Sequence, residues 1–158
     1  MSSENRMASA LARHYPGGRS AFIRAMNNKA RQLGMRNSRF YDSTGLSTRN
    51  VSTARDLAKL ITAAYRQPLI RQFTQDTNKE MRFSTPAYSL MFNNTNPLVK
   101  NPDWDVRLSK TGYTDEAGRC LLMRAKPDRQ ELAIVLLNSV GKRTPIGDAN
   151  RIRKWLKS

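Results

Sequence analysis

The sequence is poor in the residues that form most metal sites and covalent cross-links. It contains one cysteine, Cys120, and one histidine, His14. A single cysteine excludes an internal disulfide, and these two residues cannot assemble a zinc site of the usual His/Cys kind. We therefore expect no metal and no other cofactor.

Long apolar runs are also missing. The longest run, residues 132–137, is far too short to span a lipid bilayer. No cationic and apolar leader with a small-residue cleavage site precedes Ser2, so these residues show no signal peptide.

Acidic residues are scarce relative to basic ones. Lys and Arg number 28 against 12 Asp and Glu, which gives a net charge of +16 at pH 7. Such an excess favours an anionic partner. However, the basic residues are spread along the chain from Arg6 to Lys157. Proteins that bind single-stranded nucleic acid alternate basic with aromatic residues, and this pattern is missing even from the densest basic group, Arg151, Arg153, Lys154 and Lys157. We interpret the charge as a solvated basic surface that faces another kind of anion, and expect no nucleic-acid partner.

The chain does contain enough apolar residues, 39% of 158, for one domain with a real core. Helical spacing of these residues predicts helices over 4–13, 20–33, 68–73 and 145–157, and one more after a capping box at Thr53–Asp56. The last helix should turn four residues inward: Ile146, Ala149, Ile152 and either Trp155 or Leu156. Alternation predicts strands over 80–84, 88–92, 106–111, 118–126 and 131–138. This order indicates an α+β fold with helices packed around an antiparallel sheet.

Two short motifs combine residue types that suit acyl transfer. A Ser-x-Asn element comes first, as Ser3 and Asn5, and Lys110-Thr111-Gly112 follows about a hundred residues later at a strand end. In this order they resemble two of the three motifs of the penicillin-recognising serine acyl-transferases, and the chemistry of that reaction explains their residue types. A serine hydroxyl beside a lysine can pass a proton to a leaving group, while an asparagine amide holds a peptide bond. The lysine ammonium and threonine hydroxyl can bind a carboxylate, and the glycine lets a substrate lie close to the strand.

Each motif alone also has a purely structural interpretation. Ser2 or Ser3 could be the N-cap of the first helix, and the Lys-Thr-Gly element could be a strand end before a turn. The alternation of Val106 and Leu108 nevertheless places Lys110 on the core-facing side of its strand. A buried ammonium is costly unless it opens onto a cleft that holds a partner.

The sequence between the two motifs indicates a family more specifically than either motif does. The segment "LGMRNSRFYDSTGLSTRNVSTARDLAKL" resembles the corresponding part of low-molecular-mass penicillin-binding proteins, the serine D-alanyl-D-alanine peptidases. The ends of the chain, "MSSENRMASALARHYPGG" and "IGDANRIRKWL", are most similar to the D-alanyl-D-alanine endopeptidase branch. Individual pieces keep simpler roles: Thr53 and Asp56 cap a helix, Gly45 makes a turn and Phe40 fills core.

The resemblance implies a periplasmic enzyme of the penicillin-binding/β-lactamase-like transpeptidase fold that acts on peptidoglycan peptides. A serine is acylated, the acyl-enzyme is hydrolysed, and β-lactam antibiotics trap it as a stable ester. Carried over by motif, Ser3 is the second active-site serine and Asn5 binds the substrate amide. Lys110, Thr111 and Gly112 form the carboxylate-side wall, and the Tyr113 backbone N–H is an oxyanion-hole donor.

One motif of this family is not in its expected place. The nucleophile motif, Ser-x-x-Lys, should precede Ser-x-Asn, yet the single match, Ser139 to Lys142, follows the Lys-Thr-Gly strand. We interpret Ser139 as the end of the last strand. Residues 1–158 are therefore expected to be the C-terminal part of one peptidase domain, with the nucleophile, its lysine and the first strands in an upstream segment of the same protein.

Other functions fit part of the pattern. A D-alanyl-D-alanine carboxypeptidase would share every motif, and a non-catalytic basic fragment could bind an anionic polymer. A class A β-lactamase needs a deacylating Glu ahead of an Asn, but Glu80 is the sole Glu between Asn5 and Lys110 and has no such Asn. Residue chemistry does not separate the endopeptidase from the carboxypeptidase, and only the resemblance of the chain ends favours the endopeptidase.

Overall fold

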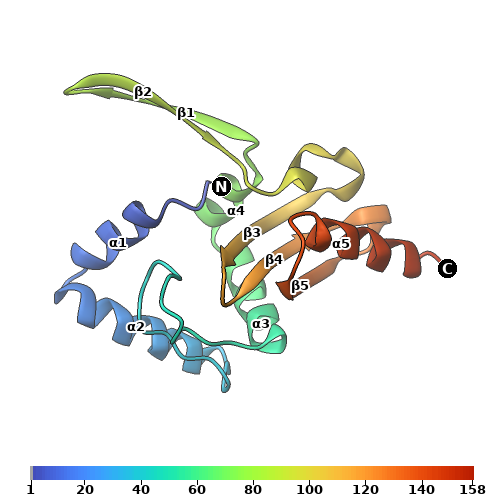
Figure 1. Cartoon of the computed structure of the whole chain (residues 1–158), viewed down its shortest axis with the longest axis horizontal. Coiled ribbons are helices and arrows are strands. Elements are labelled where there is room, and N and C mark those ends of the chain that lie inside the picture. The colour runs from blue at the N-terminus through green and yellow to red at the C-terminus, as the bar shows by residue number, and fades with distance from the viewer. Residues whose placement is uncertain (1) are drawn as a thin grey trace.

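The central element is a three-stranded antiparallel sheet in the C-terminal half of the chain, ordered β3-β4-β5 (Figure 1). The computed structural model describes residues 2–158. The strands are β1 (Asn78–Ser84), β2 (Ala87–Asn93), β3 (Val106–Thr114), β4 (Gly118–Ala125) and β5 (Leu132–Ser139). The helices are α1 (Asn5–Arg13), α2 (Gly18–Gln32), α3 (Ala54–Tyr65), α4 (Pro68–Gln75) and α5 (Thr144–Trp155), with short 3-10 turns at Pro97–Lys100, Pro102–Trp104 and Pro127–Arg129.

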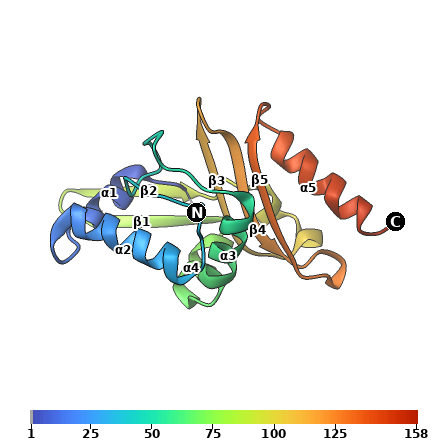
Figure 2. The same ribbon diagram turned by 90° about the horizontal axis from the view of Figure 1, so that it is seen from below.

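Helices cover both faces of this sheet, as Figure 2 shows most clearly. α3 packs on one face against β4 and β5, and α5 packs on the other. The main core lies on the α5 side, where the largest buried side chain is Trp104. Its other buried members are Leu98, Leu121, Met123, Ala125, Ile134 and Ala149. The expected α+β class with an antiparallel sheet is therefore confirmed.

The elements predicted from periodicity all form, with ends shifted by a few residues. In α5, Trp155 is 73% exposed, so Leu156, which is half-buried, is the residue that turns inward. The predicted alternation in β3 was wrong at one position, because a β-bulge lies between Val106 and Leu108. Val106 pairs with Ala125 and packs against the α5-side core, whereas Leu108 and Lys110 face the opposite side.

β1 and β2 form a separate two-stranded hairpin that projects away from the sheet (Figure 1). Only Phe83 and Phe92 in it are partly buried. A stacked pair of rings, Phe83 and Tyr88 with centroids 4.5 Å apart, stiffens its tip.

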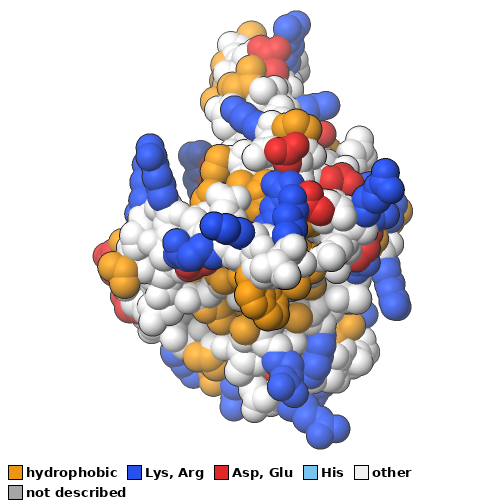
Figure 3. All heavy atoms as spheres, turned by 90° about the vertical axis from the view of Figure 1, so that its right-hand side faces the viewer, with side chains coloured by type: hydrophobic (Ala, Val, Ile, Leu, Met, Phe, Trp, Pro, Cys, Tyr) orange, Lys and Arg blue, Asp and Glu red, His pale blue; other side chains and the backbone are white. Residues whose placement is uncertain are grey.

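Basic side chains are scattered over the surface. Figure 3, which faces the α5 side of the molecule, shows Lys and Arg at many separate points of this face instead of one continuous patch. Within residues 2–158, no helix is long and apolar enough to cross a membrane.

Candidate active site

A cleft of about 900 Å³ brings together segments from the whole length of the chain. Its walls come from the residues at the start of α1, the loop between α2 and α3, the first turn of α3 and the segment after β2. They are completed by the ends of β3 and β4 next to the turn that joins them, here called their outer ends, and by the start of α5. All six residues expected from the motifs line it: Ser3, Asn5, Lys110, Thr111, Gly112 and Tyr113.

The two motifs meet directly at this cleft. Lys110 Nζ donates a hydrogen bond of 2.7 Å to Ser3 Oγ, across 107 positions of sequence. Ser3 does not cap α1, because Glu4 is the N-cap and accepts a 3.1 Å hydrogen bond from the backbone N–H of Arg6. The N-cap interpretation of Ser3 is therefore wrong. Its backbone has φ of 60°, a left-handed conformation that is unfavourable for serine and is retained only where its surroundings impose it.

Lys110 has no carboxylate partner at this site. In the part of the chain that the structure describes, no Asp or Glu lines the cleft. The ammonium donates to Ser3 and to the carbonyl of Thr111. Burial lowers the pKa of Lys110 below the ordinary lysine value, although the residue keeps open surface toward the cleft. A lowered pKa makes it easier for this group to take part in proton transfer with the adjacent hydroxyl.

The next residues of β3 present polar groups and a bare backbone to the cleft. Thr111 Oγ1 lies 2.6 Å from Thr95 Oγ1. A Cβ added at Gly112 would meet the Cβ of Cys120 at 3.9 Å, an ordinary contact, so nothing within the chain requires glycine there. Tyr113 is 54% exposed, and its hydroxyl donates to Asp115.

The outer edge of β3 pairs with no other strand among residues 2–158. The side-chain amide of Gln75 covers the start of this edge by donating 2.7 Å to the carbonyl of Arg107. Toward Tyr113 the edge borders the cleft. An unpaired edge of this kind can bind an extended peptide through main-chain hydrogen bonds.

The opposite wall is a loop, residues 36–52, that is held by two buried carboxylates. Asp42, 6% exposed, accepts hydrogen bonds from the backbone N–H groups of Thr44, Gly45 and Ser47. Burial by itself would raise the pKa of Asp42, but these bonds and one from the Thr44 hydroxyl outweigh burial and lower it. The bonds hold Thr44 and Gly45, which line the cleft together with Phe40 and Leu46.

The second carboxylate, Asp56, ties this loop to α3. It accepts hydrogen bonds of 2.8 Å from the backbone N–H of Asn37 and 2.9 Å from the hydroxyl of Ser38. Thr53 Oγ1 accepts from the Asp56 backbone N–H at 3.2 Å, which confirms Thr53 as the helix cap. The Asp56 carboxylate binds the loop and Lys59 instead of the Thr53 backbone N–H, so the second half of the predicted capping box does not form. The sequence assigned this segment only turns, caps and core, and missed that it forms a wall of the site.

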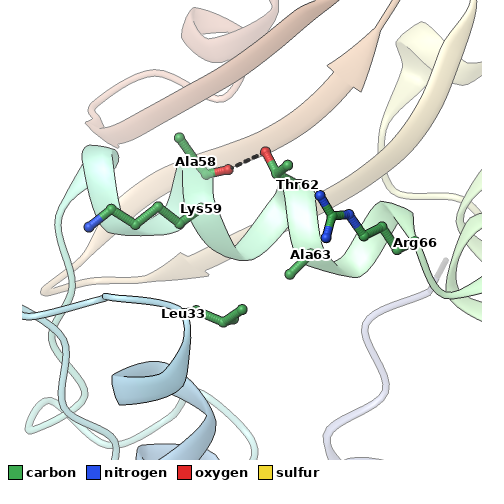
Figure 4. Close-up of a pocket in the computed structure, with 6 residues that line it drawn as sticks. All are labelled: Leu33, Ala58, Lys59, Thr62, Ala63 and Arg66. Carbon is green, nitrogen blue, oxygen red and sulfur yellow. Dashed lines mark hydrogen bonds between the residues drawn. The ribbon is translucent and has the colours of Figure 1, made fainter.

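A smaller hollow of about 420 Å³ lies between the end of α2 and α3 (Figure 4). Two basic residues, Lys59 and Arg66, line this hollow together with apolar residues and Thr62. The Thr62 hydroxyl donates a hydrogen bond to the carbonyl of Ala58. Lys59 binds Asp56 and the Gly34 carbonyl, so its ammonium supports the fold. We therefore place the candidate active site in the larger cleft.

The stray Ser-x-x-Lys match is split by the fold. Ser139 ends β5, opposite Arg119, and does not line the cleft. Lys142 does line it, together with Arg119 and Arg143. The motif analysis gave none of these three basic residues a role in the site. Arg119 and Arg143 belong to no motif, Lys142 belongs only to the misplaced match, and the three are brought together only by the sheet and the start of α5.

Comparisons with known proteins agree with this geometry. The model of the D-alanyl-D-alanine carboxypeptidase family matches residues 1–141. The chain is 51% identical over its whole length to a D-alanyl-D-alanine endopeptidase of Escherichia coli and 49% identical to one of Pseudomonas aeruginosa. It covers 51% of each, so it spans about half the length of these curated relatives.

Solved structures show the same fold. The DD-transpeptidase of Streptomyces K15 superimposes with a TM-score of 0.85 and 27% identity, over 94% of this chain and 60% of the other. A D-alanyl-D-alanine carboxypeptidase of Mycobacterium tuberculosis gives 0.78 and 26%, over 90% of this chain and 53% of the other. The resemblance to low-molecular-mass penicillin-binding proteins is thus confirmed, and the chain belongs to the D-alanyl-D-alanine carboxypeptidase family of serine peptidases.

Proposed function

We propose that this chain is the part of a peptidoglycan D-alanyl-D-alanine endopeptidase that carries its Ser-x-Asn and Lys-Thr-Gly motifs. The observation that carries the proposal is the hydrogen bond from Lys110 to Ser3, which joins the two motifs in one cleft. The two relatives near 50% identity are both named endopeptidases. The proposed location is the bacterial periplasm, where such peptides are found.

In this proposal the substrate peptide lies along the free edge of β3. Lys110 and Thr111 bind a carboxylate on the leaving side of the scissile bond, and Asn5 holds the substrate amide. The nucleophilic serine forms an ester with the D-alanyl carbonyl carbon while the carbon–nitrogen bond breaks. The proton lost by that serine reaches the leaving nitrogen through Ser3, and the Tyr113 backbone N–H stabilises the oxyanion. Water then hydrolyses the ester.

The nucleophile itself is assigned to a segment upstream of these residues in the same protein. No Ser-x-x-Lys element precedes Ser3 in the printed sequence, and the chain covers only half of its relatives. We expect that segment to supply the first strands of the sheet as well. The free edge of β5, followed by Val140 at 96% exposure, is where they would pair.

A carboxypeptidase is the second candidate. The family model carries that description, and a carboxypeptidase of Bacillus subtilis is 33% identical to this chain. The two activities differ in the size of the leaving group: a single D-alanine or the rest of a cross-linked peptide. The third candidate, a non-catalytic basic fragment for an anionic polymer, predicts no acylation in any context.

Labelled penicillin tests the proposal. We expect the full-length protein to form one covalent adduct on a serine outside residues 1–158, and the isolated chain to form none. Peptide mapping identifies the modified residue, and digestion of a cross-linked peptide compared with a D-alanyl-D-alanine pentapeptide separates the two activities. An adduct on Ser139 or another serine of this chain would overturn the assignment of the nucleophile.

A further inference from the structure

The cleft wall has a one-sided charge. Its charged lining residues within 2–158 are all cations: Lys110, Arg119, Lys142 and Arg143. One of these, Lys110, is already bound to Ser3. The other three remain to be explained.

These three cations, like most of the 28 basic residues, have no ion-pair partner among the described residues, whereas eight basic side chains do. Arg124 pairs with Glu131 and Arg153 with Asp128, for example. Arg119 instead lies with its guanidinium carbon 4.2 Å from the centre of the Tyr113 ring, and it is half-buried. Its position is therefore fixed by packing on an aromatic face, and its charge forms no ion pair, although Asp115 and Glu116 lie nearby in the β3–β4 turn.

The sheet register places the three cations at one end of the molecule. Arg119 pairs with Tyr113 on one side and with Ser139 on the other, and Lys142 and Arg143 follow Ser139 by a few residues. Arg143 is the N-cap of α5, a helix with no side-chain cap and no acid in its first turn. The positive end of that helix adds to the charge of the side chains.

The register also places Arg119 on the face of the sheet opposite to Lys110. Thr111 pairs with Leu121 and Lys110 with Leu122, so their side chains point to opposite faces of the sheet. Arg119 lies on the Thr111 face, the side of α5, and Pro145 and Ile146 complete that part of the lining. The cleft therefore has a Ser3–Lys110 lobe and a cationic lobe, which meet at the outer end of β3.

We infer that the cationic lobe binds the leaving half of a cross-linked peptide that carries at least one carboxylate beyond the one held by Lys110 and Thr111. The inference rests on the proposed function and adds a substrate class to it. A single alanine leaving group has one carboxylate, which leaves Arg119, Lys142 and Arg143 without a ligand. A second peptide strand with free carboxylates would supply anions for these cations, and a cleft of about 900 Å³ has room for more than a single alanine.

The test uses the full-length protein and two cross-linked peptides that differ only in the leaving half. In one peptide, the carboxylates of the leaving half beyond the one held by Lys110 and Thr111 are free. In the other peptide, these same carboxylates are amidated. Two quantities are measured for each peptide: kcat/KM for its cleavage, and the concentration of the peptide that halves the rate at which penicillin acylates the protein. The variants are Arg119→Gln and the double variant Lys142→Gln with Arg143→Gln, and Arg24→Gln on the exposed face of α2 is the charge-matched control.

We expect the parent and Arg24→Gln to favour the free-carboxylate peptide about 10-fold or more in both measurements. Arg119→Gln and the double variant should each bring that ratio to within about threefold of one. Added salt should reduce the parental ratio, because the lobe is open to solvent. A parental ratio near one, or an unchanged ratio in both variants, would overturn the inference.

The competition measurement separates this result from the proposed activity. In one outcome, neither peptide is cleaved, the free-carboxylate peptide still competes better with penicillin, and the variants remove this difference. The endopeptidase proposal then fails, but the binding role of the cationic lobe is supported. If both peptides are cleaved and compete equally, the endopeptidase proposal stands and the lobe is overturned.

Discussion

The two long walls of the cleft, the loop of residues 36–52 and the strand β3, use their polar groups in opposite ways. In the loop, Asp42 and Asp56 collect hydrogen bonds from their own neighbours, so the polar groups are satisfied internally. In β3, Lys110 reaches across the cleft to Ser3 and the outer edge pairs with no strand within residues 2–158. A residue that lines a site therefore need not act in its chemistry. We expect the loop to determine the stability of the fold and the strand to determine the rate of acylation.

The largest effect should come from the strand. We expect Lys110→Ala to slow penicillin acylation of the full-length protein by on the order of a hundredfold or more, because a charge and a proton partner are lost together. Ser3→Ala should do the same. Lys110→Arg should not restore the rate, since a guanidinium is planar and larger than an ammonium. The second-order rate constant of acylation is the measurement.

The fold of these variants is checked by circular dichroism and thermal melting. Because Ser3 and Lys110 are both exposed, their loss should leave the melting temperature nearly unchanged. If folded Lys110→Ala is acylated at the parental rate, the Lys-Thr-Gly element is only a strand end. The expectation that β3 determines reactivity would then be wrong.

A methyl group on the strand should also affect reactivity alone. Gly112→Ala meets only the Cβ of Cys120 at 3.9 Å within the chain, so folding should tolerate it. A substrate lying against the strand would meet the same methyl group, and we expect acylation to slow roughly tenfold. Equal acylation rates in Gly112→Ala and the parent would show that no ligand approaches this backbone closely.

The loop should show the reverse behaviour. Asp42→Ala leaves the backbone N–H groups of Thr44, Gly45 and Ser47 without their acceptor, and we expect the free energy of unfolding to fall by about 2–4 kcal/mol. Well below the melting temperature, acylation should fall far less than in Lys110→Ala. A hundredfold loss of acylation in folded Asp42→Ala would mean that the loop acts directly in the chemistry.

The pH dependence of stability sharpens the same point. The pKa of Asp42 lies below its ordinary value of 3.8 in the folded protein. The carboxylate therefore stabilises the fold above its unfolded pKa, and this contribution is lost as the pH falls through the folded pKa. The difference in melting temperature between the parent and Asp42→Asn should be constant above about pH 5 and shrink as the pH falls below about 4. A difference that does not shrink there would assign the stabilisation to shape instead of charge.

The smallest effects should come from residues outside both groups of polar contacts. Cys120→Ala removes a thiol that makes only weak contacts, at 3.6 Å to the Ala117 carbonyl. His14→Ala changes an exposed residue at the end of α1. We expect acylation rates within about twofold of the parent for both, measured as above.

Local patterns in the sequence were sufficient for the elements and for the two motifs. Spacing of Leu57, Leu60 and Ile61 behind Thr53 predicted α3, because a cap and an apolar face are local properties. The bulge after Val106 could not be predicted, since it depends on pairing with β4. The capping role of Glu4 also escaped notice, because two serines and one glutamate competed for the same position.

The basic lobe shows a different limit. Arg119 and Lys142 are ordinary surface residues by sequence, and only the β4–β5 register and the start of α5 bring them to one cleft. The motif resemblance pointed to Ser3, Asn5 and Lys110, which all line the cleft, but it gave no role to residues outside the family motifs.

The contact between Ser3 and Lys110 also has a consequence for the time at which the site forms. Its partners are separated by 107 residues, and the entropy lost on closing a loop grows with the logarithm of its length. Helix α3 and the β3–β4 hairpin are local and can form early, whereas this contact requires nearly the whole chain to be in place. In a refolding reaction, penicillin-reactive protein should therefore appear after the far-ultraviolet signal of secondary structure has been regained. Acylation would then report the last step of folding and not the first.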